Sequence, residues 1–301
     1  MTISALLRAT ALVVVAAIAV ALFLLFRPKT LLDTGPLNLP GVPDAPAAGE
    51  EVLLAVGDIG FCGHLADDRV AELAAGLPGT IALLGDNVYP SGNPAGLDAT
   101  VFGPFAAVLD HVPLYAILGN HDVKRNRAQA QVRALGMPGR WWVHHLPGDV
   151  LLLGLDSTLV DDPGQHAWLE QTLASATERW RLVAVHHPAY SAGYQGSSHE
   201  VRRRWSPLFA RYRVALVLSG HDHDYQRSVP IDGVTYVVSG GGSRPRRTAR
   251  APFTAVAWGW LHAVEVAVFA DQLVVRAVGR DLGVGDEAAV RAVTPDPRTG
   301  R

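Results

Sequence analysis

Residues 81–89 read IALLGDNVY, an apolar run that ends in a polar cluster containing Asp86 and Tyr89. A short run of branched aliphatic residues is typical of a strand that is buried on both faces of a sheet. Other apolar runs end in the same way, and they are followed by Gly57-Asp58-Ile59-Gly60, Gly119-Asn120-His121-Asp122, His186-His187-Pro188 and Ser219-Gly220-His221-Asp222-His223. The sequence therefore predicts five buried strands that carry reactive side chains at their carboxyl ends.

From residue 51 onward, short apolar runs alternate with segments of helical periodicity. Predicted strands lie at 52–56, 81–84, 114–118, 150–155, 182–185 and 214–218, and antiparallel strands follow at 234–239, 262–269 and 273–278. Predicted helices lie at 65–75, 163–176 and 199–212, with Asp162 as the N-cap of the second. The pattern indicates an α/β layered fold in which two sheets can pack together. If the five strands run parallel within one sheet, their polar clusters meet at one edge.

The polar clusters contain only oxygen and nitrogen donors, which favour hard or borderline metal ions. The candidate ligands are Asp58, Asp86, Tyr89, Asn120, His186, His221 and His223. This set is larger than one ion normally needs. If one carboxylate bridges, the donors divide between two ions held about 3.5–4 Å apart.

The order GD-x-G, GD-x-x-Y, GNH, VxxH and GHDH resembles the calcineurin-like metallophosphoesterases, and the tyrosine resembles their purple acid phosphatase branch. The resemblance covers roughly residues 51–240. It implies a four-layer αββα sandwich of two mixed sheets, with a dinuclear centre at the carboxyl ends of the strands. It also implies the division of ligands: Asp58, Asp86, Tyr89 and His223 for the first ion, and Asp86 (bridging), Asn120, His186 and His221 for the second. In the family His121 would be the proton donor or a contact to the substrate phosphate.

The charge of each ligand set predicts the metal. The first set has three anionic ligands once Tyr89 is a phenolate, and a phenol with a pKa near 10 loses its proton only beside a strong Lewis acid. This set favours Fe(III). The second set has one shared carboxylate, an amide and neutral imidazoles, which suits divalent Fe, Zn or Mn. The alternative for Tyr89 is an aromatic side chain that merely lines the loop.

One departure from the purple acid phosphatase pattern concerns substrate binding. That pattern has a substrate-facing histidine about nine residues beyond the VxxH histidine, where this chain has Gln195. His187, Gln195 and His199 are the candidate substrate-binding residues, and His64 is a further substitute. Asp122, Asp156 and Asp222 are expected either to orient histidines or to cap helices and turns.

These features predict an enzyme, a dinuclear-metal hydrolase that cleaves phosphate esters by attack of hydroxide generated at the two ions, with His121 assisting. Small-molecule phosphomonoesters are the expected substrates, as for an acid phosphatase. A phosphodiesterase or nucleotide hydrolase on the same centre is the first alternative. A catalytically silent, membrane-tethered binding module is the second.

The N-terminal sequence predicts membrane attachment. Residues 9–26 have Thr10 as their only polar side chain, and as a helix they would span about 27 Å, close to the thickness of the hydrocarbon core. Because no small-residue cleavage site follows, residues 1–29 are interpreted as a signal anchor. A linker rich in proline and glycine would occupy 30–50, the metallophosphoesterase domain 51–281 and a loose tail 282–301. An extracytoplasmic catalytic domain is expected, although the flanking charges leave the orientation open.

The bulk composition excludes other classes of protein. The chain has 301 residues and a formal net charge of −2, so no basic face indicates a nucleic-acid partner. The arginines at 202–204 and 244–247 are interpreted as solvated surface. Cys62 is the only cysteine, which excludes an internal disulfide.

Overall fold

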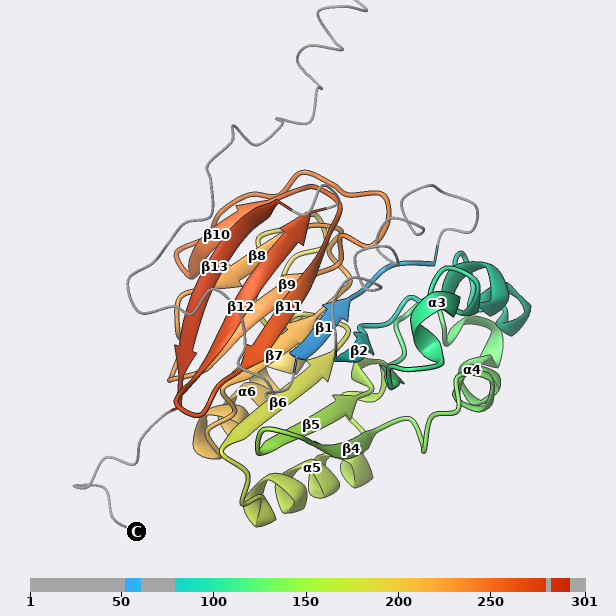
Figure 1. The fold of residues 1–301 in the computed structure, drawn as a ribbon. Coiled ribbons are helices and arrows are strands. Elements are labelled where there is room, and N and C mark those ends of the chain that lie inside the picture. The colour runs from blue at the N-terminus through green and yellow to red at the C-terminus, as the bar shows by residue number, and fades with distance from the viewer. Residues whose placement is uncertain (1–51, 61–78, 280–282, 293–301) are drawn as a thin grey trace, which may run out of the picture. The chain divides into compact units, whose positions relative to one another are not determined.

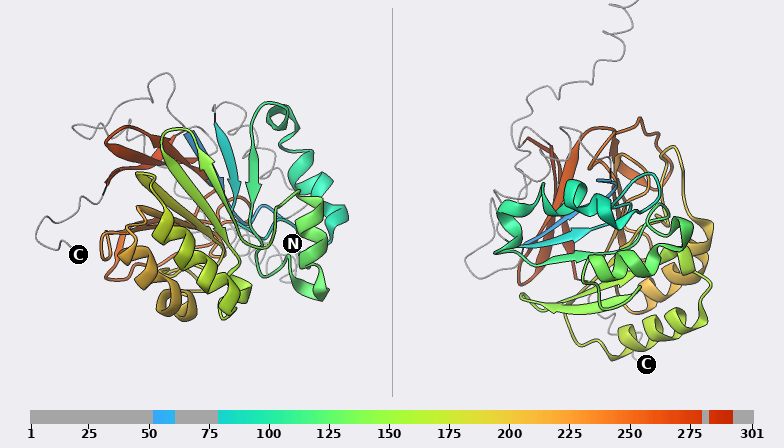
Figure 2. Two further views of the ribbon diagram at one scale, coloured as in Figure 1. Left: turned by 90° about the horizontal axis from the view of Figure 1, so that it is seen from below. Right: turned by 90° about the vertical axis from the view of Figure 1, so that its right-hand side faces the viewer.

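The computed structural model describes residues 52–60, 79–279 and 283–292, which form two β-sheets packed face to face (Figures 1 and 2). The predicted anchor, linker and helix at 65–75, together with Cys62 and His64, lie outside these ranges. Within them, no helix is long and apolar enough to cross a membrane.

The first sheet has the strand order β13-β12-β11-β1-β2-β3. The neighbouring pairs β1–β2 and β2–β3 are parallel, whereas β11, β12 and β13 join by antiparallel pairing. The bounds are β1 (Val52–Val56), β2 (Thr80–Leu83), β3 (Leu114–Ala116), β11 (His262–Val268), β12 (Gln272–Gly279) and β13 (Val284–Arg291). All residues of β1 and β2 are buried, as expected for strands covered on both faces.

The second sheet has the strand order β10-β8-β9-β7-β6-β5-β4. Strands β5, β6, β7 and β9 are parallel neighbours, and β4, β8 and β10 pair antiparallel. The bounds are β4 (Trp142–Leu146), β5 (Val150–Leu155), β6 (Trp180–Val185), β7 (Leu216–Ser219), β8 (Tyr225–Ser228), β9 (Thr235–Ser239) and β10 (Thr254–Trp258). Both sheets are therefore mixed, and the predicted α/β sandwich of two mixed sheets is confirmed.

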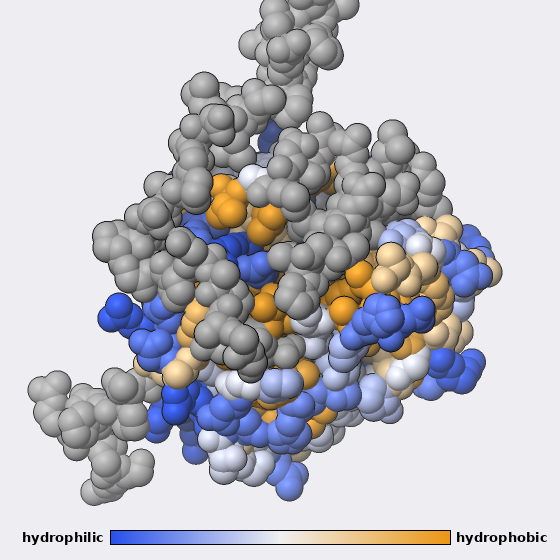
Figure 3. All heavy atoms as spheres, in the orientation of Figure 1, coloured by the Kyte–Doolittle hydropathy of each residue, from blue (hydrophilic) through white to orange (hydrophobic). Residues whose placement is uncertain are grey.

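Two long helices, α5 (Pro163–Ser175) and α6 (His199–Arg211), cover the outer face of the second sheet (Figure 2). Asp162 caps α5 as predicted, because its carboxylate accepts a hydrogen bond from Gln165 N. The lower part of the face drawn in Figure 3 is mainly hydrophilic. The shorter elements are η1 (Pro94–Gly96), η2 (Asp98–Phe102), α3 (Ala106–Leu109), η3 (Lys124–Asn126), α4 (Ala128–Ala134) and η4 (Ser157–Leu159).

Two hydrophobic layers hold the described domain together. The larger lies between the sheets and joins side chains of both, such as Leu54 and Val264 from the first and Leu152 and Leu182 from the second. The smaller packs α5 and α6 onto the second sheet and includes the buried Trp205. Burial of this apolar area is the main force that keeps the strand ends in place.

The condition that the five strands with polar clusters share one sheet is not met: β1, β2 and β3 belong to the first sheet, and β6 and β7 belong to the second. The expectation about the tail is wrong over part of its length. Residues 284–291, expected to lie within a loose tail, form β13 along the whole of β12. The charges that suggested a tail are paired, since Arg227 Nε lies 2.6 Å from Asp286 Oδ2 and Arg276 Nε lies 2.6 Å from Glu287 Oε2.

Candidate metal centre

The carboxyl ends of the parallel strands in the two sheets meet at one place. Asp58, Asp86 and Asn120 follow β1, β2 and β3, whereas His186 follows β6 and His221 follows β7. Hydrogen bonds cross between the sheets here: Gly57 N donates to Ser239 O at 2.8 Å, and the ring of His186 bonds Leu84 O at 2.8 Å through Nδ1. The predicted convergence is therefore real, but it arises across two sheets and not along one edge.

The backbone is strained at this junction. Asp58, Asp86 and His221 have positive φ values of 61°, 54° and 73°, a region that residues other than glycine rarely adopt. Such strain persists only where the surroundings hold it, and it gathers at functional sites. Here it turns three candidate ligands sharply out of their strands.

Glycine before a ligand leaves room for the neighbouring carboxylate. A Cβ on Gly119 would lie 2.1 Å from Asp86 Oδ1, and one on Gly220 would lie 2.7 Å from Asp58 Oδ2. No side chain fits at either position without displacing a carboxylate.

Tyr89, Asp58 and His223 form the first ligand group. The Tyr89 hydroxyl donates to Asp58 Oδ1 at 2.8 Å and lies 3.0 Å from His223 Nε2. His223 Nε2 is also 3.4 Å from Asp58 Oδ1. Its Nδ1 lies 3.1 Å from the carbonyl oxygen of Arg244, which orients the ring and turns Nε2 to the group.

Asp86, Asn120, His186 and His221 form the second group of candidate ligands. His186 Nε2 lies 3.5 Å from Asp86 Oδ1 and 3.2 Å from Asn120 Oδ1, and the rings of His186 and His221 have centroids 5.1 Å apart. Asp86 also connects the groups, because donor atoms of Asp58, Asp86 and His186 all lie within 4.8 Å of one another. This is the arrangement that a bridging carboxylate requires.

The electrostatics of this buried cluster fit bound cations. Burial and the charges of Asp58 and Asp86 raise the pKa of Tyr89 far above its usual value. Burial raises the pKa of Asp58, but its bond to His223 and the charges of His186 and His223 outweigh this and lower the pKa overall. Burial and His186 lower the pKa of His221 to about 3, so its imidazole stays neutral and available as a ligand. Anionic and neutral donors packed together with little solvent are stabilised by a cation among them.

His121 lies at the mouth of the centre, with a side chain that is 27% exposed. Its backbone N–H donates to Asp86 Oδ1 at 2.8 Å, and its Nδ1 lies 2.7 Å from Pro90 O. Its Nε2 is 4.0 Å from Asp86 Oδ2 and 3.2 Å from Lys124 Nζ. The ring is therefore held beside the second group, where a substrate oxygen could reach it.

The three other aspartates do not bond histidine side chains among the described residues, which favours the capping alternative over the orientation of histidines. Asp122 accepts hydrogen bonds from backbone amides of Gly119, Asn87 and Val88. Asp156 caps η4 and pairs with Arg140, and Asp222 accepts from Ser191 Oγ and from the amides of Gln195 and Gly196. These aspartates shape the ligand loops, which is the capping alternative.

The candidate substrate residues lie in different surroundings. His187 is half-buried beside the ligands, and its ring centroid is 4.4 Å from that of His221. Burial and the charges of His186 and His221 lower the pKa of His187 to about 2. Gln195 is exposed, and its backbone N–H donates to Asp222 Oδ1. His199 is exposed at the start of α6. Of the three, His187 is the one that the fold brings to the ligands within the described part of the chain.

Two cations near the centre were missed by sequence reasoning. Lys124 Nζ is 3.0 Å from His121 Nδ1, and Arg246, interpreted as solvated surface, donates its backbone N–H to His223 O at 2.6 Å. The Arg246 guanidinium also lies 5.4 Å from the ring of Tyr194, which is 78% exposed. No motif marks either residue, because each approaches the ligands only through loop folding.

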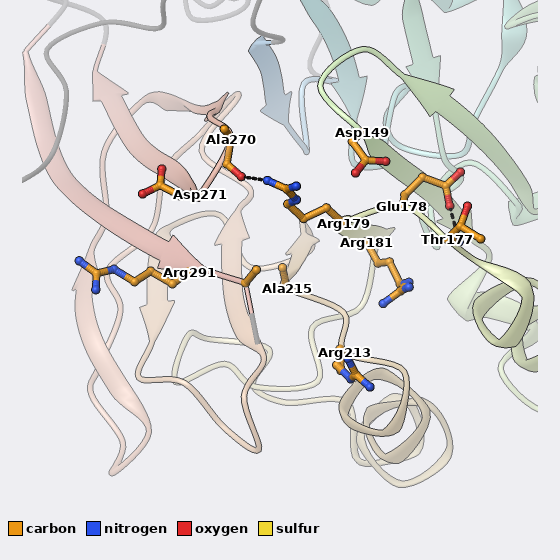
Figure 4. Close-up of a pocket in the computed structure, with 11 residues that line it drawn as sticks. Asp149, Thr177, Glu178, Arg179, Arg181, Arg213, Ala215, Ala270, Asp271 and Arg291 are labelled. Atoms are coloured by element: carbon orange, nitrogen blue, oxygen red, sulfur yellow. Dashed lines mark hydrogen bonds between the residues drawn. The ribbon is translucent and has the colours of Figure 1, made fainter. Parts of the chain in front are cut away.

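A hollow of about 810 Å³ lies at the other end of the second sheet (Figure 4). It is lined by Asp149, Arg179 and Arg213, which precede β5, β6 and β7, and by Arg181 near the start of β6, whereas the candidate ligands follow the strands. Arginines and acids both line it, and it contains none of the candidate ligands. It is therefore separate from the candidate metal centre.

Comparison with known proteins agrees with this fold and site. The family model described as calcineurin-like phosphoesterase matches residues 52–225, so the chain belongs to that family. Human tartrate-resistant acid phosphatase type 5 is 31% identical over 198 residues, covering 54% of this chain and 61% of the relative. Purple acid phosphatase 3 of Arabidopsis thaliana is 26% identical over 234 residues, covering 65% and 64%. The chain thus spans about three fifths of the length of these curated relatives.

Solved structures show the same fold. Purple acid phosphatase PPD1 from yellow lupin superposes with a TM-score of 0.68 at 18% identity, covering 83% of this chain and 55% of that one. GAP50, the anchor in the inner membrane complex of Plasmodium, superposes with a TM-score of 0.73 at 16% identity, covering 82% and 90%. At these identities the likeness concerns the fold alone. The predicted membership of the calcineurin-like superfamily, near its purple acid phosphatases, is confirmed.

Proposed function

We propose that the protein is a metal-dependent phosphoric ester hydrolase that acts as a phosphatase. The observation that carries the proposal is the junction of the two ligand groups, where donors from both sheets lie around Asp86 within 4.8 Å. Two bound ions supply Lewis acidity at phosphorus and a nucleophile at neutral pH. Because the donor set is intact, it argues against a catalytically silent binding module.

Fe(III) in the first group and divalent Fe, Zn or Mn in the second are the metals that the donors favour. Tyr89 supports this choice, because its hydroxyl lies 2.8 Å from Asp58 and 3.0 Å from His223. The protein alone raises the pKa of this phenol, so only a strong Lewis acid would make it a phenolate ligand. The three anionic donors then match a trivalent charge.

Phosphomonoesters are the proposed substrates. A monoester dianion carries one more negative charge than a diester, and two cations lie near the candidate ligands. Lys124 Nζ is 3.0 Å from His121 Nδ1, and the charge of Arg246 acts on His223. Coulomb attraction to these cations favours the dianion. His121 is proposed as the phosphate contact or proton donor, since its Nε2 lies 4.0 Å from Asp86 Oδ2.

A nucleotide hydrolase or phosphodiesterase is the second candidate function. The observation that favours it is the ring of Tyr194, which is 78% exposed and carries the Arg246 guanidinium at 5.4 Å. An exposed aromatic ring beside a cation can stack a nucleobase. If the protein is a nucleotide hydrolase or phosphodiesterase, Tyr194 binds the leaving group. If it is a phosphomonoesterase, Tyr194 has no assigned role.

We further propose that residues 9–26 anchor the protein in a membrane and that the catalytic domain lies outside the cytoplasm. The support is the apolar run and the Pro- and Gly-rich segment after it. Small-molecule esters and a membrane are then the partners of the chain.

The deciding assay compares hydrolysis of an aryl phosphate monoester with that of the matching diester. The full-length protein, in detergent, is loaded with iron plus zinc or with manganese, and Asp86→Asn is the control. Monoester preference that disappears in the control supports the phosphatase. Diester preference supports the second candidate, and full metal content without activity towards either ester refutes both.

A further inference from the structure

We propose that His187 presents its Nε2–H to the second ligand group and donates a hydrogen bond from it to the substrate phosphate. In this role it replaces the histidine that the purple acid phosphatase pattern places at Gln195. The inference rests on the proposed function, because it assigns a specificity residue to the same centre.

His187 lies close enough to the second ligand group to contact a phosphate bound there. It follows β6 directly after His186, and one ring nitrogen each from His186, His187 and His221 lie within 4.8 Å of one another. The ring centroids of His187 and His186 are 5.1 Å apart, in edge-to-face orientation. The ring therefore borders the group that would hold the second ion.

Ser157 determines which nitrogen carries the proton. Its Oγ accepts the backbone N–H of His187 at 3.1 Å and lies 2.7 Å from His187 Nδ1. A hydroxyl has one proton to donate, and Nδ1 lies within hydrogen-bond distance of this one. In the proposed tautomer the hydroxyl donates to Nδ1, and the ring proton of His187 lies on Nε2.

The loop that carries Ser157 is held firmly. Ser157 is buried at the start of η4, which Asp156 caps through the amide of Thr158 at 2.9 Å. The Gln165 side chain on α5 bonds both the N–H and the C=O of Asp156, at 2.8 and 3.0 Å. These bonds place the hydroxyl for Nδ1 before any ligand binds, as preorganised sites require.

The tautomer separates His187 from its neighbours. A nitrogen that carries a proton cannot coordinate a metal ion, but it can donate to an anionic oxygen. His187 Nε2 is therefore a phosphate donor and not another ligand. Gln195 does not occupy this place: its backbone N–H donates to Asp222 Oδ1, and the residue is exposed.

The test uses two substitutions that divide the functions of the ring. In His187→Gln the side-chain amide reaches the position of Nε2 and can still donate. In His187→Asn it reaches only the position of Nδ1. Each full-length variant is loaded with zinc, and its metal content, its thermal unfolding midpoint and its dissociation constant for inorganic phosphate are measured.

We expect full metal content and an unchanged midpoint in both variants. Phosphate binding weakens about tenfold in His187→Asn, the loss of one buried hydrogen bond, and stays within about threefold of wild type in His187→Gln. Loss of metal from His187→Asn overturns the proposal, since it identifies His187 as a ligand. Equal phosphate binding by both variants and the wild type overturns it as well.

A nitrogen-15 spectrum of the zinc-loaded protein gives an independent reading of the tautomer. The signal of His187, assigned by its absence in His187→Gln, should show an unprotonated Nδ1, and Ser157→Ala should shift the proton toward Nδ1. A protonated Nδ1 in the wild type overturns the proposal. A protein that binds phosphate through His187 but cleaves no ester refutes the phosphatase function and leaves this assignment intact.

Discussion

Replacing Gly119 with alanine should displace the carboxylate of Asp86, which is the proposed bridging ligand. The new Cβ would lie 2.1 Å from Asp86 Oδ1 and 2.3 Å from Asp86 N, whereas real Cβ contacts essentially never fall below 3.0 Å. The carboxylate must therefore move by about 0.9 Å, away from the place where both ligand groups share it. Its bond from His121 N, 2.8 Å long, is lost with the same movement.

A misplacement of about 1 Å at a reacting centre costs on the order of 100-fold in rate. We therefore expect kcat/KM of Gly119→Ala for an aryl phosphate to fall about 100-fold, together with bound metal. Elemental analysis and steady-state kinetics on the same preparation measure both. Gly283→Ala is the matched control, because nothing lies within 4 Å of its added Cβ. The reasoning is refuted if Gly119→Ala keeps two metals and a kcat/KM within threefold of the control.

Three further predictions concern stability and substrate charge. Asp286→Ala removes the carboxylate that bonds both the buried Tyr225 hydroxyl and Arg227. This change should lower the free energy of unfolding, measured in urea, by about 3–5 kcal/mol. A loss below about 1 kcal/mol would show that β13 contributes little to stability. Burial raises the pKa of Asp224 to about 7 from an ordinary 3.8, so the folded protein keeps a proton that the unfolded chain releases. Stability of the metal-free protein should thus fall as the pH rises from about 4 to 7, and Asp224→Asn should flatten that fall; urea titrations that coincide for variant and wild type contradict this. Lys124→Ala should raise KM several-fold for the monoester and little for the diester, and equal changes for both would remove the charge argument for monoesters.

The candidate ligands could be predicted from the sequence because each follows a buried strand directly. An apolar run specifies the strand, and Gly-Asp or Gly-Asn-His after it specifies where the chain turns and which donor it presents. These are local properties of the chain, so residues such as Asp58 and His221 were assigned to one site without coordinates. Their roles as ligands stay a prediction that metal analysis must test.

Strand partners could not be predicted, because pairing depends on residues far apart in the chain. The hydrophobic runs of β1 and β6 are similar in sequence. Only the packing of the two sheets determines which sheet each strand joins. β8 and β13 were missed for a related reason. Their charged residues Arg227 and Asp286 have the pattern of a loop. Asp286 is buried and Arg227 is partly buried because the two form an ion pair across the fold.

By itself, the sequence determined the chemistry of this protein: the types of donor, their order and the glycines that make room for them. The tertiary structure decided which donors meet and in which protonation state. His187 shows the difference, because its Nδ1 lies 2.7 Å from Ser157 Oγ, which is thirty residues earlier in the chain and on the loop after β5. The physical reason is that a hydrogen bond depends on distance and direction in space, and neither follows from local sequence.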